Sequence, residues 1–86
     1  MISREVIIKN SAGLQSKSAA VFIQKASMFK SSIWVEKEER KANAKSLLGL
    51  LSLSIGSGSK VTISAEGEDE EKAVQDLNDY LSSDAQ

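Results

Sequence analysis

The apolar residues of this chain change several times between a two-residue and a helical repeat, and this alternation constrains the fold more than any other feature. Alternating or β-branched runs predict four strands, at residues 3–9, 33–36, 41–44 and 60–65. Helical spacing and a leucine-rich run predict three helices, at residues 16–29, 47–53 and 70–81. This order predicts an α+β fold with an antiparallel sheet covered on one face by two long helices and one short helix, an outline that ferredoxin-like sheets share.

The length of the chain limits its organisation. Its 86 residues suffice for one small domain, 1–86. No apolar run approaches the roughly 20 residues that a membrane span needs, and no signal-peptide pattern opens the chain. We therefore expect a cytoplasmic protein that does not engage a membrane.

The chain contains neither cysteine nor histidine, and their absence excludes much enzyme chemistry. Without cysteine there are no disulfides, thiolate nucleophiles or zinc–thiolate sites. Without histidine there is no Ser-His-Asp triad and no phosphohistidine, and the commonest metal ligand is missing. We therefore expect a protein that is not an enzyme and that holds no metal or other cofactor. Serine, at 15 of 86 residues, is unusually abundant.

The net charge of −1 conceals an uneven distribution. Residues 1–65 hold ten basic and four acidic side chains (+6), whereas residues 66–86 hold one basic and eight acidic side chains (−7). The basic residues are scattered and are not interleaved with aromatic ones, unlike those of nucleic-acid-binding surfaces. We therefore expect an acidic last helix on a basic body, with no direct binding to nucleic acid.

The first candidate site is the segment 13–18, Gly-Leu-Gln-Ser-Lys-Ser, which leads into the first long helix. Unpaired N–H groups at a helix N-terminus attract anions, and Ser16, Lys17 and Ser18 would add donors. The simpler interpretation is a glycine turn followed by Ser16 as the N-cap. The spacing favours that simpler interpretation, because it lacks the full signature of a phosphate-binding loop.

The second candidate is Ser46, which follows Lys45 and precedes the leucine-rich run. As an N-cap, the Ser46 hydroxyl would accept a hydrogen bond from a free backbone N–H group. As a phosphorylation site, it would gain a charge of about −1.5 to −2 at the helix end where the dipole favours negative charge. The pattern alone favours the plain cap.

The third candidate is the leucine-rich run itself. Five leucines in seven positions cannot all face inward on so short a helix, so some of Leu47, Leu48 and Leu51 should lie at the surface. Exposed apolar clusters often mark partner contacts, and burial on both sides is the alternative. Trp34 alternates out of phase with its apolar neighbours and should point away from the core.

Taken together, these segments resemble the HPr family of small phosphocarriers of the bacterial sugar phosphotransferase system. Residues 43–53, Asn-Ala-Lys-Ser-Leu-Leu-Gly-Leu-Leu-Ser-Leu, resemble the regulatory serine segment of the family. Residues 13–18 align with its active-site segment, where the family pattern is Gly, apolar, His, Ala, Arg, Pro. Residues 65–71 resemble its junction into the last helix. The resemblance covers essentially the whole chain and implies an HPr-like open-faced β-sandwich.

The chain departs from the family pattern at the active-site segment. Gln15 stands at the position of the phosphorylated histidine, and a carboxamide is not a usable phosphoryl acceptor because its nitrogen lone pair is delocalised. Lys17 stands at the arginine position and keeps the charge, but it lacks the planar fork that holds phosphate bidentately. Ser16 and Ser18 replace alanine and proline. The resemblance with these departures implies that histidine phosphotransfer is absent.

A glutamine at that position, with the serine segment kept, is typical of the catabolite-repression HPr (Crh) branch of the family. Resemblance to this branch implies that a bifunctional HPr kinase/phosphorylase phosphorylates Ser46. It implies that the product is a corepressor of a LacI-type regulator, catabolite control protein A. It also implies a set of partner-binding residues: Lys17, Lys45, Leu47, Leu48 and Leu51.

Two other functions remain open at this stage. A divergent phosphocarrier of the phosphotransferase system would need another phosphoryl acceptor, such as Ser16 or Ser18. A structural binding module would use the leucines for self-association. Members of the Crh branch can exchange their first strand between protomers, so a strand-exchanged homodimer is a further expectation.

Overall fold

The computed structural model describes residues 1–11 and 13–83, apart from the side chain of Ser16. The described part forms four strands and three helices: β1 (Ile2–Ile7), α1 (Ser16–Ser27), β2 (Ser32–Lys37), β3 (Arg40–Asn43), α2 (Leu47–Ser52), β4 (Lys60–Glu66) and α3 (Glu70–Leu81). The order of elements agrees with the sequence prediction. The boundaries differ from it by a residue or two, as helix and strand ends commonly do.

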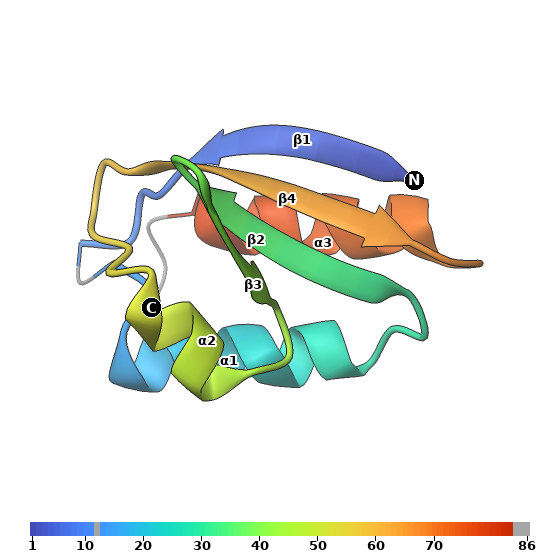
Figure 1. Cartoon of the computed structure of the whole chain (residues 1–86), viewed down its shortest axis with the longest axis horizontal. Coiled ribbons are helices and arrows are strands. Elements are labelled where there is room, and N and C mark those ends of the chain that lie inside the picture. Colours follow the sequence, from blue (N-terminus) through green and yellow to red (C-terminus); the bar gives the residue numbers. More distant parts are fainter. Residues whose placement is uncertain (12, 84–86) are drawn as a thin grey trace.

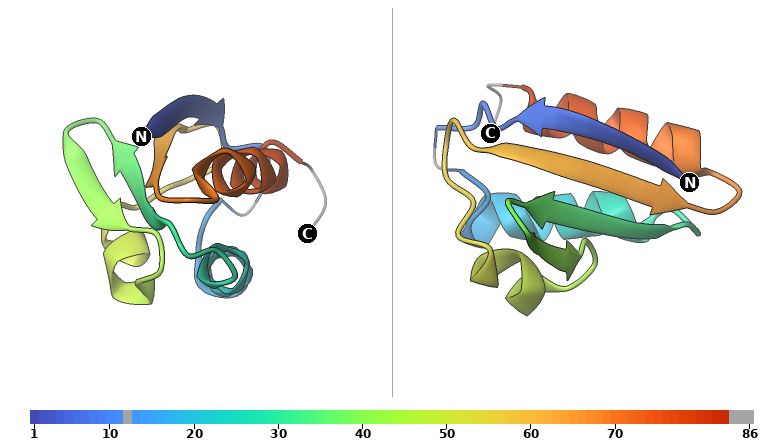
Figure 2. Two further views of the ribbon diagram at one scale, coloured as in Figure 1. Left: turned by 90° about the vertical axis from the view of Figure 1, so that its right-hand side faces the viewer. Right: turned by 45° about the horizontal axis from the view of Figure 1, so that its top comes forward.

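The four strands form one antiparallel sheet in the order β1-β4-β2-β3. Strand β4 therefore lies between β1 and β2, and its Ile63 is opposite both Arg4 of β1 and Val35 of β2. All three helices lie on one side of the sheet, and the other side is open (Figures 1 and 2). The predicted α+β open-faced sandwich is confirmed, and the strand order settles the topology that periodicity left open.

The core fills the space between the sheet and the helices. The inward side chains of β4 are Val61, Ile63 and Ala65, and all three are buried, as their alternation predicted. Helix α1 contributes Phe22, and helix α3 contributes a stripe of four buried side chains. Its members are Ala73, Val74, Leu77 and Leu81. Apolar burial on this one face is what holds the helices to the sheet.

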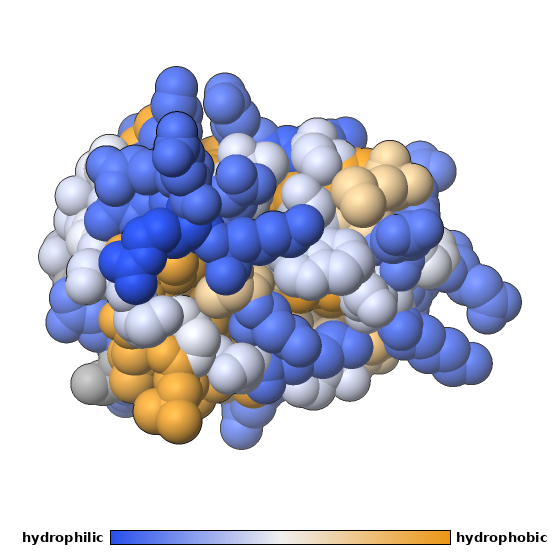
Figure 3. Space-filling model, in the orientation of Figure 1, coloured by the Kyte–Doolittle hydropathy of each residue, from blue (hydrophilic) through white to orange (hydrophobic). Residues whose placement is uncertain are grey.

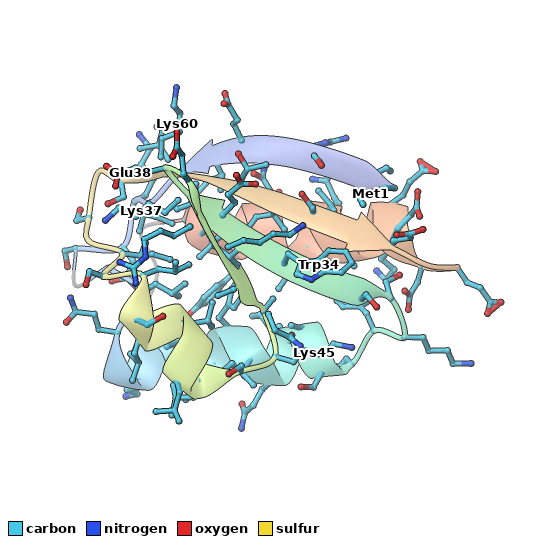
Figure 4. The ribbon with its side chains drawn as sticks, in the orientation of Figure 1. Met1, Trp34, Lys37, Glu38, Lys45 and Lys60 are labelled. Carbon is cyan, nitrogen blue, oxygen red and sulfur yellow. The ribbon has the colours of Figure 1, made fainter. Side chains whose placement is uncertain are left out.

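The open face of the sheet carries Trp34 of β2, which points away from the core as predicted. The ammonium group of Lys41, on β3, lies 4.8 Å from the centroid of the Trp34 ring, a distance typical of a cation–π contact. Figure 4 shows the ring lying over β2. Strand β3 forms one edge of the sheet, in agreement with its short and charged sequence.

The turn between α1 and β2 is fixed by Asp69, the N-cap residue of α3. The Asp69 carboxylate makes no capping hydrogen bond within α3. It accepts hydrogen bonds from the backbone N–H groups of Lys30 (2.9 Å) and Ser31 (3.0 Å) and from the Ser31 hydroxyl. The expected local cap is therefore replaced by a tie to a turn 38 residues away.

Gly67 permits the close packing of this turn. Its φ is +152°, and a Cβ atom there would lie 2.6 Å from Ser31 Oγ and 2.7 Å from Ser31 Cα. Because Ser31 is only 1% exposed and bonded to Asp69, it has no room to move aside.

We therefore expect Gly67→Ala to lower the free energy of unfolding by about 1–3 kcal/mol, through the clash and the strained backbone. Urea denaturation measures this loss. Gly56→Ala is the matched control, because a Cβ atom at Gly56 meets nothing within 4 Å. Equal stabilities of the two variants would contradict the expectation.

The hydrogen bonds of the Asp69 carboxylate should also make the stability of the fold depend on pH in the acidic range. The hydrogen bond from the Ser31 hydroxyl and that from the Lys30 N–H are the main causes that lower the pKa of Asp69 below its ordinary value. A lowered folded-state pKa stabilises the fold fully above the unfolded-state value, about 3.9. That stabilisation is lost as the pH falls through the lower, folded-state pKa.

We expect Asp69→Asn to be less stable than the wild type at neutral pH and to lose less stability on acidification below about pH 4. Urea midpoints measured from pH 6 down to about pH 2.5 would test this. Glu68→Gln is the control, because Glu68 is an exposed neighbour with no hydrogen bond or ion pair to the described residues. Parallel acid profiles for wild type and Asp69→Asn would refute the argument.

Candidate phosphorylation and docking site

The two candidate segments of the sequence lie side by side, because the N-terminal turn of α1 is joined to the chain that follows α2. The Leu14 N–H group donates a 2.9 Å hydrogen bond to the Ile55 carbonyl. Gly13 makes this approach possible: its φ is +72°, and a Cβ atom there would lie 2.6 Å from the Ile55 oxygen. The start of α1 and all of α2 therefore belong to one region of the surface (Figure 1).

The N-cap of α1 is Gln15, and the prediction of Ser16 as the cap is wrong by one residue. Gln15 has an extended backbone (φ −138°, ψ 152°), and its carbonyl oxygen accepts from the Ser18 N–H group at 3.0 Å. The Gln15 N–H group donates in turn to Ser18 Oγ at 3.0 Å. Ser18, the third residue of the helix, thus supplies the reciprocal hydrogen bond of a capping box. Ser16 is the first residue of the helix and not its cap.

The hydroxyl group of Ser18 is committed to this cap. Its oxygen lies 2.7 Å from the Gly13 carbonyl and 2.9 Å from the Gln15 carbonyl, and the residue is buried. The side chains of Gln15 and Lys17 are exposed. The arrangement therefore offers a partner an amide and an ammonium group, while the described serine hydroxyl faces inward. The side chain of Ser16 lies outside the described part of the structure.

Ser46 is the N-cap of α2, as the sequence predicted. Its backbone is extended (φ −113°, ψ 115°), and its Oγ accepts a 3.1 Å hydrogen bond from the Gly49 N–H group. The residue is half-buried, and α2 follows it at once. Phosphorylation of this hydroxyl remains a prediction that the fold alone does not test.

The surface of α2 exposes the three leucines that the sequence singled out. Their exposed fractions are 43% for Leu47, 81% for Leu48 and 39% for Leu51. Leu50 and Leu53 are buried instead. We call the three exposed residues the leucine patch; Figure 3 shows apolar side chains gathered over α2. The expected exposure is confirmed, whereas partner binding by the patch stays a prediction.

The ammonium group of Lys45 is hydrogen-bonded within the chain, and binding of a partner by this residue stays a prediction. Its Nζ donates hydrogen bonds to the Phe29 carbonyl at 2.9 Å and to the Ser31 carbonyl at 3.1 Å. It therefore connects the N-terminal end of α2 to the turn between α1 and β2. Figure 4 labels Lys45 at the end of β3, just before α2.

Lys37, which the sequence did not single out, holds the other end of α2. Its Nζ donates to the Ser54 carbonyl at 2.7 Å and to the Leu53 carbonyl at 3.4 Å. These are carbonyl groups just past the C-terminal end of α2, where a cation is favourable. No local pattern could have indicated this contact, since Lys37 and Ser54 are 17 residues apart.

Metal binding and membrane spanning find no support in the described residues. Among residues 1–11 and 13–83, no group of three or more Asp and Glu side chains is placed to hold a metal ion. None of the helices in the same ranges has the length and apolarity that crossing a membrane requires.

Comparison with known protein families finds a match over nearly the whole chain. The family model described as "PTS HPr component phosphorylation site" matches residues 2–83. The chain is 46% identical over 81 residues to the HPr-like protein Crh of Halalkalibacterium halodurans, covering 94% of this chain and 96% of that protein. It is 42% identical over 81 residues to Crh of Bacillus subtilis, with 94% and 95% covered.

Solved structures agree with these sequence matches. HPr of Thermoanaerobacter tengcongensis superposes with a TM-score of 0.92 at 48% identity, covering 94% of this chain and 91% of that chain. Crh of Bacillus subtilis superposes with a TM-score of 0.79 at 40% identity, covering 100% of this chain and 99% of that chain. The latter crystal structure is described as a domain-swapped, intertwined dimer.

Proposed function

The chain belongs to the HPr family, and on that premise we propose that it is a regulatory member, switched by phosphorylation of Ser46. HPr and Crh proteins are phosphocarrier or regulatory proteins and not enzymes. In our proposal, an HPr kinase/phosphorylase modifies Ser46 in the cytoplasm. The phosphorylated protein is then a corepressor of a LacI-type regulator in carbon catabolite repression and does not itself bind nucleic acid.

One observation carries the proposal: Ser46 caps a short helix whose outer surface is a patch of exposed leucines. A modified hydroxyl at this position changes the charge at the border of an apolar contact area. An arginine of the partner can pair with the phosphate, while the leucines contribute apolar area. Lys17, exposed on the adjacent α1, adds a positive charge to the same region.

The phosphorylation step is an ordinary phosphoryl transfer. Ser46 Oγ attacks the γ-phosphorus of ATP, the bond to the β,γ-bridging oxygen breaks, and ADP leaves. The hydroxyl proton passes to a base on the kinase. Ser46 Oγ accepts a hydrogen bond from the Gly49 N–H group through one lone pair, and its second lone pair would attack, so the phosphate would be added beside the start of α2.

Two observations favour regulation over the alternative function as a phosphocarrier. The chain has no histidine, and Gln15 stands where the family carries the phosphoryl acceptor. Ser18, one of the two substitute acceptors considered, has its hydroxyl buried and bonded within the α1 cap. Neither group presents a free nucleophile at the start of α1.

A homodimer is part of the proposal as well. The Bacillus subtilis Crh structure is described as a swapped dimer, and this chain is similar to it over its full length. Strand β1 lies at the edge of the sheet and pairs only with β4. Exchange of β1 between two copies would therefore preserve all other strand pairs.

We expect HPr kinase/phosphorylase with ATP to add one phosphoryl group to the wild type and none to Ser46→Ala. Intact-mass spectrometry measures the gain. Losing the cap costs α2 about 1 kcal/mol, so circular dichroism should confirm that Ser46→Ala remains folded. Ser52→Ala, which removes an exposed hydroxyl at the other end of α2, is the matched control and should be modified like the wild type.

Phosphorylation of the Ser46→Ala variant would overturn the proposed switch at Ser46. A wild-type protein that gains no phosphoryl group would overturn it as well. A parallel reaction with phosphoenolpyruvate and enzyme I tests the phosphocarrier alternative. We expect no transfer; phosphate on Ser16 or Ser18 would favour that alternative instead.

The leucine patch should be required for binding the regulator. We expect Leu48→Ala to weaken binding of the phosphorylated protein about tenfold, which corresponds to roughly 1.4 kcal/mol of lost apolar contact. Titration calorimetry against catabolite control protein A measures the affinity. Met28→Ala is the control, because Met28 is 82% exposed, like Leu48 at 81%, but follows the far end of α1. Equal losses in both variants would exclude a specific role for the patch.

A further inference from the structure

The position of the Lys45 ammonium group is not the one that a phosphate contact would need. Lys45 immediately precedes Ser46, yet its Nζ is bonded to the carbonyl groups of Phe29 (2.9 Å) and Ser31 (3.1 Å). Its backbone N–H group donates to Asn43 Oδ1 at 2.8 Å. Both ends of this residue are therefore used within the chain.

The turn that receives Lys45 is itself rigidly held. Ser31 is 1% exposed, and its N–H and hydroxyl groups both donate to the carboxylate of Asp69. The carbonyl oxygen of the same residue accepts from Lys45. Hydrogen bonds thus connect Asp69, at the start of α3, through Ser31 to Lys45, which is joined by a peptide bond to Ser46, the residue that caps α2.

Helix α2 needs such an external attachment. It has six residues, too few for a helix to be stable by itself in water. Lys37 donates to the carbonyl groups after its C-terminal end, and Lys45 connects its N-terminal end to the turn between α1 and β2.

We propose that Lys45 is a positioning residue for the phosphorylation of Ser46, and that it acts by fixing the start of α2 and not by touching the phosphate or the kinase. This inference rests on the proposed function, because it concerns the same modification. To pair with a phosphate, the Lys45 ammonium would have to leave two carbonyl oxygens, and leaving buried polar groups unpaired is costly.

The proposal has a specific kinetic consequence. If Lys45 only fixes the start of α2, its loss lets Ser46 and Gly49 open more often, and the kinase must order them on binding. That cost raises KM and leaves kcat nearly unchanged. A lysine that contacted the transferring phosphate would instead lower kcat, because its contribution would arise in the transition state.

Hydrogen exchange of the unmodified protein tests the attachment without any kinase. We expect Lys45→Met to accelerate exchange of the Ser46 and Gly49 amides about tenfold, since these donate to the Asn43 carbonyl and to Ser46 Oγ. Ile63, in the central strand, should stay protected and so show that the fold is intact. Lys45→Arg retains several N–H donors and should restore most of the protection.

The matched control for these variants is Lys60→Met, which removes an exposed lysine from the beginning of β4 (Figure 4). It should leave the exchange of both α2 amides unchanged. Unchanged exchange in Lys45→Met as well would overturn the proposed attachment.

Steady-state phosphorylation by HPr kinase/phosphorylase completes the test. We expect Lys45→Met to raise KM about five- to tenfold with kcat within twofold, and Lys45→Arg to recover most of the loss. A fall in kcat at unchanged KM would overturn the positioning role in favour of direct contact. A wild type that is not phosphorylated would refute the proposed function itself, whereas a normally modified Lys45→Met would refute only this inference.

Discussion

The pairing of β4 along both of its edges is the constraint on which the other features depend. Strand β4 is the last strand of the chain, but it lies between β1 and β2. The chain must therefore leave the sheet after β1 and form β2 one strand position away. The gap between these two strands is later filled by β4. Helix α1 makes that crossing, and α3 follows β4 back along the same face (Figure 2). The inward residues of β4 belong to the same buried core as residues of α1 and α3, so the burial of this strand is shared with both helices and both neighbouring strands.

The same arrangement brings together the polar groups that form the long-range hydrogen bonds. The turn before β2 lies beside the start of α3, and this proximity lets Asp69 bind the backbone of Lys30 and Ser31. Lys45 approaches the same turn from the segment between β3 and α2. The proposed regulatory surface is thus supported by contacts with the rest of the fold and not by the short helix α2 alone.

The sequence predicted those features that depend on residues close together in the chain. Alternation identified the buried side of β4, and the number of leucines in a short helix predicted that some of Leu47, Leu48 and Leu51 would be exposed. It could not predict contacts whose two groups are far apart in the chain. The hydrogen bonds of the Asp69 carboxylate, for example, depend on Ser31, 38 residues away. The partners of Lys45, and the whole role of Lys37, depend on tertiary contacts in the same way.

The position of Trp34 has a consequence for how this protein can be observed. It is the only tryptophan in the chain, it lies on the open face of the sheet, and a lysine ammonium group stands over its ring. Its fluorescence therefore reports on the pairing of β2 with β3, which carries that lysine. The leucine patch is on α2, on the helical side of the molecule (Figures 1 and 3). The molecule thus carries an intrinsic optical probe of sheet integrity that is spatially separate from its proposed docking surface.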